Sequence, residues 1–459
     1  MRIALARFFK QILFFGTFFS LILFYSKFTS LSCSSMCEDL ILEKHQKISG
    51  SNQNSDGKIR TLKIGLGNDQ YNKEILYSVY SNDGQISGYI TDGKSFEKNN
   101  KNTFIEAVKI KLIGGALQKK YNIWYRANVE GQGWLGWARN GEICGSVGAN
   151  LAIKDLEIIL LEKDAKLEIL KYTRPPAIIR ISRNSVLSEC GGRSKTIKFR
   201  TNEGIKFFKY QKRVDREDNI TCWNWLLGVD KGKDFFDSKV RNVATKRLAE
   251  LLGIEKIVAN CQMVTVKKIG EQDADGLLLE GTKGIDFWPF RESGNKNITT
   301  SFVKNLYNLE ILDGICSQLD RCPWNYSIIR SSNGEPVNVV GYDNDLSFGT
   351  INDLKNFRYW GCYLVGYNGQ INLPHMDREL AEKILAITEE QVESAIFDVL
   401  DPIYVESTKI RFRQVKKAIE ETVLHRKNFL LDFWDHSVLN DDSNFPAFTY
   451  LKLFKERIR

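Results

Sequence analysis

Apolar and polar residues alternate along most of the chain between residues 60 and 163. The stretches Tyr121-Asn-Ile-Trp-Tyr-Arg-Ala-Asn-Val and Ala107-Val-Lys-Ile-Lys-Leu show this alternation most clearly. Because successive side chains of a β-strand point to opposite faces, a period of two residues predicts strands with one buried face. Glycines separate the stretches, as is typical of turns between short strands. We therefore predict an all-β region over residues 60–163.

The same pattern occurs twice in this region, at a constant offset of 48 residues. The matching positions are Ile75, Tyr77, Gly88, Tyr89, Gly93, Ile105, Val108 and Leu112 in the first copy, and Ile123, Tyr125, Gly136, Trp137, Gly141, Ile153, Leu156 and Leu160 in the second. A short repeated unit cannot bury its apolar face alone, so neighbouring units are expected to stack. The offset predicts two β units, each completing the core of the other.

After Thr173 the pattern changes to strands followed by long helices. Residues 237–253 carry apolar residues at helical spacing, with Asp237 or Ser238 to cap the start and Gly253 at the end. This combination predicts a helix. The apolar stretch 309–319 and three segments beginning near residues 373, 388 and 407 predict further helices. The chain as a whole is therefore expected to have an α+β fold.

The first 32 residues predict a signal peptide or a signal-anchor. Arg2, Arg7 and Lys10 precede an apolar run from Ile12 to Tyr25, which is the order found in secretory signals. We expect this segment to insert into a membrane. The rest of the chain is expected to be exported to the cell surface, the extracellular space or a secretory lumen. Whether the segment is cleaved stays open. Residues 33–59 are expected to form a linker.

Length and composition narrow the possible functions. A chain of 459 residues with 43% hydrophobic residues and only 8 prolines is expected to form two or three ordered domains. The formal net charge of +9 suits anionic partners, but no Arg-rich tract or aromatic–basic platform indicates a nucleic-acid partner. The nine cysteines form no Cys-x-x-Cys pair and there are four histidines, so neither a zinc site nor a His-rich metal site is expected.

Two segments carry residues suited to binding phosphate groups. Gly191 and Gly192 lie between two predicted strands, where backbone N–H groups can approach phosphate oxygens. The following strand carries Lys206 and Lys209, which a regular strand would place on opposite faces. We select Lys209, which follows Phe207-Phe208, as the residue that binds phosphates.

An aspartate and an asparagine are followed by further aspartates, which are residue types that phosphoryl transfer uses. Asp320 and Asn325 form an Asp-x4-Asn segment, and Asp343 and Asp345 follow after a predicted turn and strand. The reaction needs one carboxylate to orient and deprotonate the acceptor hydroxyl, and oxygen ligands to hold magnesium against the phosphates. We expect the two loops to emerge at adjacent strand ends.

These segments resemble those of known kinases. Asp320-Arg-Cys-Pro-Trp-Asn325 resembles the Asp-Arg-His-x-x-Asn catalytic loop of phosphatidylinositol kinase-like and HipA-like enzymes. Asp343-Asn-Asp-Leu-Ser-Phe-Gly resembles the metal loop of those enzymes and of secretory-pathway kinases. The resemblance extends from Ile181 to Val423 and implies a two-lobed kinase-like fold, with a β-rich N-lobe at 173–283 and a helical C-lobe at 284–459.

The resemblance also implies roles for individual residues. Asp320 would be the catalytic base. The residues that would bind ATP are Gly191, Gly192, Lys209 and Glu280, the last in the connector 276–284 between the lobes. The ligands that would hold Mg²⁺ or Mn²⁺ are Asn325, Asp343 and Asp345.

A second resemblance lies in the second β unit. The motif Gly133-Trp134-Leu-Gly136-Trp137, with Asn140-Gly141-Glu142 and Gly145 behind it, resembles the clostridial hydrophobic-tryptophan (ChW) repeats of bacterial surface proteins. The first unit has Ile86 where such a repeat carries tryptophan. This resemblance implies extracellular attachment or recognition. The same aromatic residues can also be core residues, and the two interpretations are compatible.

Two positions differ from the kinase-like families. Cys322 stands where they have histidine, and Asn242 or Arg241 stands where the helix beside the lysine strand should offer a glutamate. Two functions therefore remain open. One is an exported kinase that transfers the γ-phosphoryl group of ATP to a protein, glycan or lipid hydroxyl. The other is a non-catalytic cell-surface binding protein with a pseudokinase domain.

Overall fold

The computed structural model of the chain describes residues 57–64, 74–91, 94–97, 100, 102–190, 195–210, 238–268, 272–286, 298–318, 321, 325–350, 373, 375–425 and 429–435. The predicted signal segment and the predicted site residues Gly191, Gly192 and Asp320 lie outside these ranges. Within them, no helix combines the length and the apolar character needed to cross a membrane.

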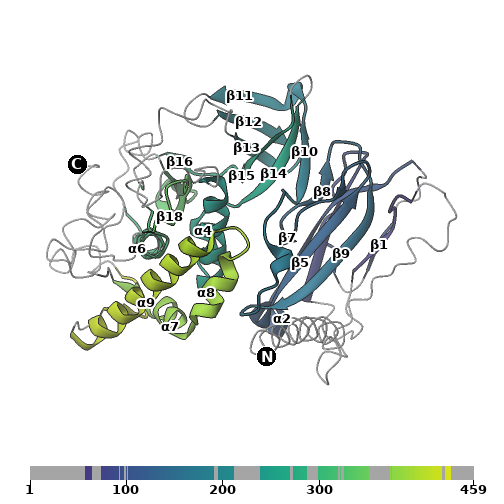
Figure 1. Ribbon diagram of the computed structural model, residues 1–459. Coiled ribbons are helices and arrows are strands. Elements are labelled where there is room, and N and C mark those ends of the chain that lie inside the picture. Colours follow the sequence, from purple (N-terminus) through teal and green to yellow (C-terminus); the bar gives the residue numbers. More distant parts are fainter. Residues whose placement is uncertain are drawn as a thin grey trace, which may run out of the picture.

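One large sheet contains strands of both β units and the strands around the predicted lysine strand β13 (Figure 1). Among the described residues, its order is β11-β12-β13-β15-β14-β10-β8-β4-β2. β10 pairs in parallel with both β8 and β14, and so joins the β units to the strands that follow. The strands are β2 (Ile75–Ser81), β4 (Ile105–Leu112), β8 (Cys144–Val147), β10 (Ala177–Ile181), β11 (Val186–Cys190), β12 (Lys195–Thr201), β13 (Gly204–Tyr210), β14 (Cys261–Lys268) and β15 (Ala274–Glu280).

A second sheet contains β5 (Tyr121–Val129), β6 (Gly133–Trp134), β7 (Ala138–Arg139) and β9 (Ile153–Glu162). Its pairing copies that of β2 with β4 at the 48-residue offset. Ile75 faces Leu112 in the first unit, and Ile123 faces Leu160 in the second. A β-bulge follows the equivalent position in each unit. Apolar side chains of both units form one core between the two sheets.

Tyr77 and Tyr125 occupy the same place in the two units. The Tyr125 hydroxyl donates to the Glu142 carbonyl at 2.5 Å and accepts from the Ile110 amide at 3.0 Å. The Tyr77 hydroxyl lies against the backbone of Leu62 and Lys94, the residues 48 positions earlier. The repeat in the sequence is therefore also a repeat of buried hydrogen bonds.

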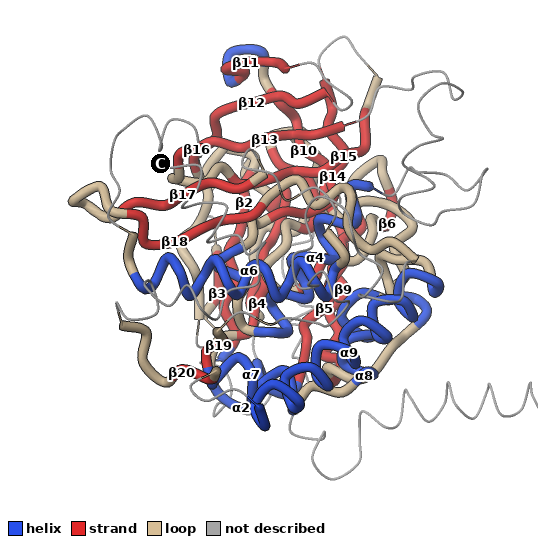
Figure 2. The backbone as a smooth tube through the Cα atoms, turned by 90° about the vertical axis from the view of Figure 1, so that its left-hand side faces the viewer, coloured by secondary structure: helices blue, strands red, loops and turns tan. Residues whose placement is uncertain are grey.

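The helices lie beside these sheets and form the largest hydrophobic core with a short β-hairpin (Figures 1 and 2). The main helices are α4 (Ser238–Leu252), α6 (Thr300–Cys316), α7 (Arg378–Ala386), α8 (Glu389–Ile396) and α9 (Pro402–His425). The hairpin is formed by β17 (Tyr326–Arg330) and β18 (Pro336–Gly341), with β16 (Ile285–Asp286) paired to β17. The expected α+β class is confirmed.

Shorter elements complete the described structure. They are β1 (Leu62–Lys63), β3 (Ser95–Phe96), β19 (Met376–Asp377), β20 (Leu430–Leu431), α2 (Gly115–Lys120), and the 3-10 helices η4 (Glu168–Leu170), η5 (Arg183–Ser185) and η7 (Glu255–Ile257). The described cysteines Cys144, Cys190, Cys261 and Cys316 form no disulfide.

Helix ends follow local signals in some cases and not in others. Gly253, with φ of 73°, terminates α4, and Thr388 with Gln391 forms a capping box at the start of α8. α6 begins earlier than the predicted residue 309, because Thr299 caps it by accepting the Phe302 amide at 3.2 Å. Every residue of α6 from 306 to 316 is buried. The start of the helix is marked by the Thr299 cap, which lies ahead of this fully buried run.

The second β unit and the helices share a buried, charged interface. The guanidinium groups of Arg139 and Arg247 both contact the Trp124 ring, at 5.4 and 5.5 Å from its centre. Arg247 of α4 pairs with Asp398 behind α8 and lies 3.6 Å from Glu142. All of these side chains are almost fully buried. Removing one partner would leave an uncompensated charge in the interior.

We expect Arg247→Met to lower the free energy of unfolding by about 3–5 kcal/mol, because Asp398 would stay buried without its cation. The double variant Arg247→Met/Asp398→Leu should recover part of this loss, because the buried Asp398 charge is removed together with its cation, while the contact of Arg247 with Glu142 stays lost. As a control, Arg413→Met removes an exposed pair with Glu389 and should cost less than about 1 kcal/mol. Urea unfolding measures all three, and equal losses at Arg247 and Arg413 would contradict the assignment.

Candidate functional site

The β17–β18 hairpin brings the two predicted chemical segments together. Asn325 directly precedes β17 and Tyr342 directly follows β18, and Tyr326 faces Gly341 across the ladder. The Tyr342 amide donates to the Asn325 carbonyl at 3.0 Å. The two segments therefore join the hairpin at adjacent strand ends, as we expected from the sequence. Figure 2 shows the hairpin alongside α6.

The loop after β18 has an unusual backbone. Asp343 and Phe348 have φ of 56° and 61°, in the left-handed region that non-glycine residues rarely adopt. Phe348 is held there because its side chain is fully buried and its amide donates to the Cys316 carbonyl at 2.6 Å. Such backbone outliers concentrate at functional sites, where the surrounding structure holds them.

Lys209 reaches this loop from the large sheet. Its ammonium group lies 2.5 Å from Asp343 Oδ1 and 3.0 Å from Asp345 Oδ2. The three side chains come from β13 and from a loop more than 130 residues later in the chain. The predicted phosphate-binding lysine and two predicted metal ligands thus lie at one place.

The first turn of α4 closes the other side of this cluster. Lys239 Nζ lies 2.7 Å from Asp345 Oδ2, and Asn242 Nδ2 donates to Asp345 Oδ1 at 2.7 Å. Asn242 Oδ1 also accepts the Asn344 amide at 2.8 Å. Arg241 donates to the carbonyl of Ser347. α4 therefore contacts the loop through cationic and amide groups.

Arg321 lies beneath both loops. It is 3% exposed and forms a two-point pair with Asp313 of α6, with both distances 2.9 Å. Its Nη1 atom donates to the carbonyls of Asn325 and Tyr342, each at 2.7 Å. Its Nη2 atom, which also contacts Asp313, donates to Asn344 Oδ1 at 2.5 Å. Arg321 therefore connects α6 to both ends of the hairpin and to the loop after β18; the predicted base Asp320 precedes it and lies outside the described residues.

Burial and charge act against each other in the cluster. Burial alone would lower the pKa of Lys209, but Asp345 and Asp343 outweigh it and raise that pKa. Burial alone would raise the pKa of Asp345, but Lys239 and Lys209 lower it. For Lys239 burial prevails over Asp345, and its pKa is lowered. Asp345 is therefore held as an anion beside a protonated Lys209.

Glu280 lies elsewhere. Its carboxylate accepts from Lys206 at 3.0 Å, across the β13–β15 ladder. β13 pairs without a register shift, so Lys206 and Lys209 point to opposite faces of the sheet. The Glu280 side chain is thus on the face opposite to the Lys209 cluster.

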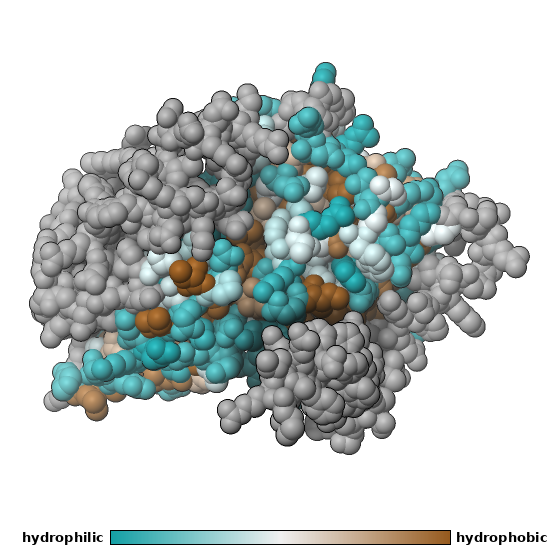
Figure 3. Space-filling view, viewed as in Figure 1, coloured by the Kyte–Doolittle hydropathy of each residue, from teal (hydrophilic) through white to brown (hydrophobic). Residues whose placement is uncertain are grey.

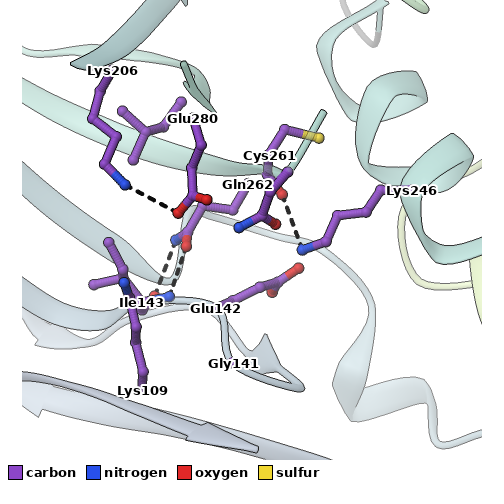
Figure 4. Close-up of a pocket in the computed structure, with 11 residues that line it drawn as sticks. Lys109, Gly141, Glu142, Ile143, Lys206, Lys246, Cys261, Gln262 and Glu280 are labelled. Carbon is purple, nitrogen blue, oxygen red and sulfur yellow. Dashed lines mark hydrogen bonds and ion pairs between the residues drawn. The ribbon is translucent and has the colours of Figure 1, made fainter. Parts of the chain in front are cut away.

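A pocket lies next to Glu280, at the junction of β4, β8, β13–β15 and α4 (Figure 4). Three lysines, Lys109, Lys206 and Lys246, line it together with acidic and polar residues. Lys109 pairs with Glu203 at 2.6 Å and Lys206 with Glu280 at 3.0 Å. The first of these pairs joins β4 to the turn before β13, and the second links the neighbouring strands β13 and β15.

The oxygen groups of the cluster fit magnesium bound together with a nucleotide. Among the described residues, no three His, Cys, Asp or Glu side chains gather as a metal cage. Magnesium, however, is usually held by one or two carboxylates together with substrate phosphates. The Asp343 side chain is 39% exposed beside Lys209, so it is open to such a ligand set.

The aromatic motif of the second β unit is packed within that unit. The Arg126 guanidinium lies 4.9 Å from the Trp134 ring centre and 4.7 Å from that of Trp137, and pairs with Glu157 at 2.7 Å. A Cβ at Gly136 would overlap the Arg174 carbonyl oxygen, so the approach of the following segment requires glycine there. In Figure 3 the described surface on this side of the molecule is mainly hydrophilic, with hydrophobic side chains in small patches.

Sequence reasoning did not find several of these contacts. Lys239, Asn344 and Gln318 were not selected, although Gln318 donates to the Asp343 carbonyl at 3.2 Å. A weak signal for Lys239 was present, because it lies three residues before Asn242 and so on the same helix face.

Comparison with known families gives one match. Residues 128–162 match the family described as "Clostridial hydrophobic W". This agrees with the resemblance of the second β unit to ChW repeats, and it covers a small part of the chain. A comparison with curated proteins found no match.

Substituting Asp343 by glycine and by alanine tests the backbone of the loop, because both changes remove the same carboxylate. Asp343→Gly should be more stable than Asp343→Ala by about 1–2 kcal/mol, because only glycine adopts the left-handed conformation without strain. At Asp345, whose φ is not positive, the order should reverse, with the glycine variant less stable by about 0.4–1 kcal/mol. Urea unfolding measures both differences. The same order at both positions would show that the loop backbone differs from that described.

Proposed function

We propose that this protein is an exported, ATP-dependent phosphotransferase with an atypical kinase-like domain. In this proposal β10–β15 with α4 form the N-lobe, and the hairpin with α6–α9 forms the C-lobe. The observation that carries the proposal is the 2.5 Å contact between Lys209 and Asp343. The sequence assigns Lys209 to phosphate binding and Asp343 to metal binding, and the two residues are 134 positions apart in the chain.

Each group has a role that its surroundings support. Lys209 would neutralise phosphate oxygens, because its raised pKa keeps it protonated. Asp343, with Asn325 on the neighbouring loop, would hold Mg²⁺ or Mn²⁺. Asp320 would accept a proton from the acceptor hydroxyl. ATP supplies the phosphoryl group, and the metal ion reduces the repulsion between its phosphates and the incoming oxygen.

The proposed reaction balances without a further reactant. An acceptor hydroxyl oxygen forms a bond to the γ-phosphorus while the bond from that phosphorus to the β–γ bridging oxygen breaks. The hydroxyl proton passes to the Asp320 carboxylate, and ADP leaves with the bridging oxygen. The acceptor can be a protein, glycan or lipid hydroxyl, because substrate choice depends on surfaces that differ among enzymes of one fold.

Export and attachment belong to the same proposal. The N-terminal segment would direct the chain to a membrane, and the second β unit would act outside the cell as ChW-like units are expected to. The match of residues 128–162 supports this part. It also supports the alternative function, a non-catalytic surface-binding protein in which the nucleotide site is inactive. The two functions differ in whether Mg²⁺-ATP binds.

The full chain should show a higher thermal unfolding midpoint with Mg²⁺-ATP than without it. A ligand at a hundredfold excess over its Kd contributes about 2.7 kcal/mol to the folded state. Asp343→Asn keeps the shape of the side chain but removes its charge, so the magnesium-dependent part of the increase should disappear. Asp432→Asn is the matched control, because this exposed carboxylate pairs with Arg378. The control should respond like the unsubstituted chain.

An unchanged midpoint in every protein would contradict the nucleotide site and favour the binding function. An equal rise in the Asp343→Asn variant would contradict the metal-binding role of Asp343.

A further inference from the structure

The carboxylate of Asp345 is enclosed by three donors. Its Oδ2 atom contacts Lys239 at 2.7 Å and Lys209 at 3.0 Å, and its Oδ1 atom accepts from Asn242 at 2.7 Å. The side chain is only 16% exposed. The donors come from two elements, β13 and α4, so this one carboxylate connects the sheet, the helix and the loop.

The neighbouring Asp343 has different surroundings. Its side chain is 39% exposed, and its described ion pair is the single contact with Lys209. A metal ion could approach Asp343 from solvent, whereas at Asp345 it would first have to displace an ammonium or amide donor. The two carboxylates of this loop therefore differ in how accessible they are to a metal ion.

The residues that α4 contributes to the cluster explain the role of Asp345. α4 has no acidic residue in its first turn, so the helix offers Lys209 no carboxylate from this position. At that position the helix carries Lys239, which contacts Asp345 Oδ2, the same atom that Lys209 contacts. Two ammonium groups that approach each other repel unless an anion lies between them. Asp345 is that anion.

We propose that Asp345 is a positioning residue that holds Lys209 and Lys239 side by side, so that two ammonium groups face the phosphates of a nucleoside triphosphate while Asp343 alone of the pair binds the metal ion. This inference rests on the proposed function. Both ammonium groups contact the same Oδ2 atom, so they are no further apart than the sum of those two contact distances. A polyphosphate can contact two cations at such a separation.

Moving the carboxylate from the loop to the helix tests this assignment. Asp345→Asn leaves the two lysines without their shared anion. The double variant Asp345→Asn/Lys239→Glu removes one cation and returns a carboxylate to the neighbourhood of Lys209. We would compare the full-length chain, both single variants and the double variant. Asp432→Asn serves as the control.

The first readout is urea unfolding without nucleotide. Both single variants should be less stable than the unsubstituted chain, and the double variant should be more stable than Asp345→Asn. A double variant no more stable than Asp345→Asn would overturn the inference, because Asp345 would then not be holding cations. This readout does not depend on ATP binding.

The second readout is the binding of ATP at fixed Mg²⁺ and at varied Mg²⁺. Asp345→Asn should weaken ATP binding by about tenfold to a hundredfold, the range for a lost hydrogen bond to a charged group. The Mg²⁺ concentration for half-maximal binding should stay unchanged. A shift of that concentration, without rescue in the double variant, would make Asp345 a metal ligand and overturn the inference. Rescue of stability in a chain that binds no ATP would instead contradict the proposed function.

Discussion

A guanidinium group buried in a protein must be surrounded by oxygen acceptors, and the candidate site depends on how Arg321 meets this requirement. Its acceptors are Asp313 on α6, the carbonyls of Asn325 and Tyr342 at the two ends of the hairpin, and Asn344 in the following loop. Arg's planar, forked geometry suits several acceptors at once. Arg321 therefore links α6, both ends of the hairpin and the loop after β18 through one side chain.

Helix α4 connects this site to the β units. Its first turn contacts the loop through Lys239 and Asn242, while Arg247 near its other end contacts Trp124 and Asp398. The position of the helix is thus determined at both ends by buried polar contacts. A shift of the second β unit would therefore act on the same helix that contacts Asp345. The continuous large sheet gives a second connection, because β10 pairs with β8 on one side and β14 on the other.

Where burial follows a regular period, the sequence predicted the structure well. The strands of both β units, the helix at 238–252 and the capped helix after Thr388 follow from alternation, apolar stripes and capping residues. The start of α6 was missed, because the capping residue Thr299 was not recognised ahead of the apolar run at 309–319. The contacts of Lys239 and Gln318 were missed for another reason. They join residues about a hundred positions apart or depend on a loop conformation, and neither is recorded in local spacing.

The sequence by itself determined which residues form strands and helices, the 48-residue repeat and the order of the residues suited to phosphate chemistry, because these follow from local periodicity and residue type. Only the tertiary structure decided which of them meet. It placed Lys209 with Asp343 and Asp345 but Lys206 with Glu280, because these two lysines project from opposite faces of β13. It also placed a lysine of α4 beside Asp345, because the partner of a buried charge depends on which elements pack around it.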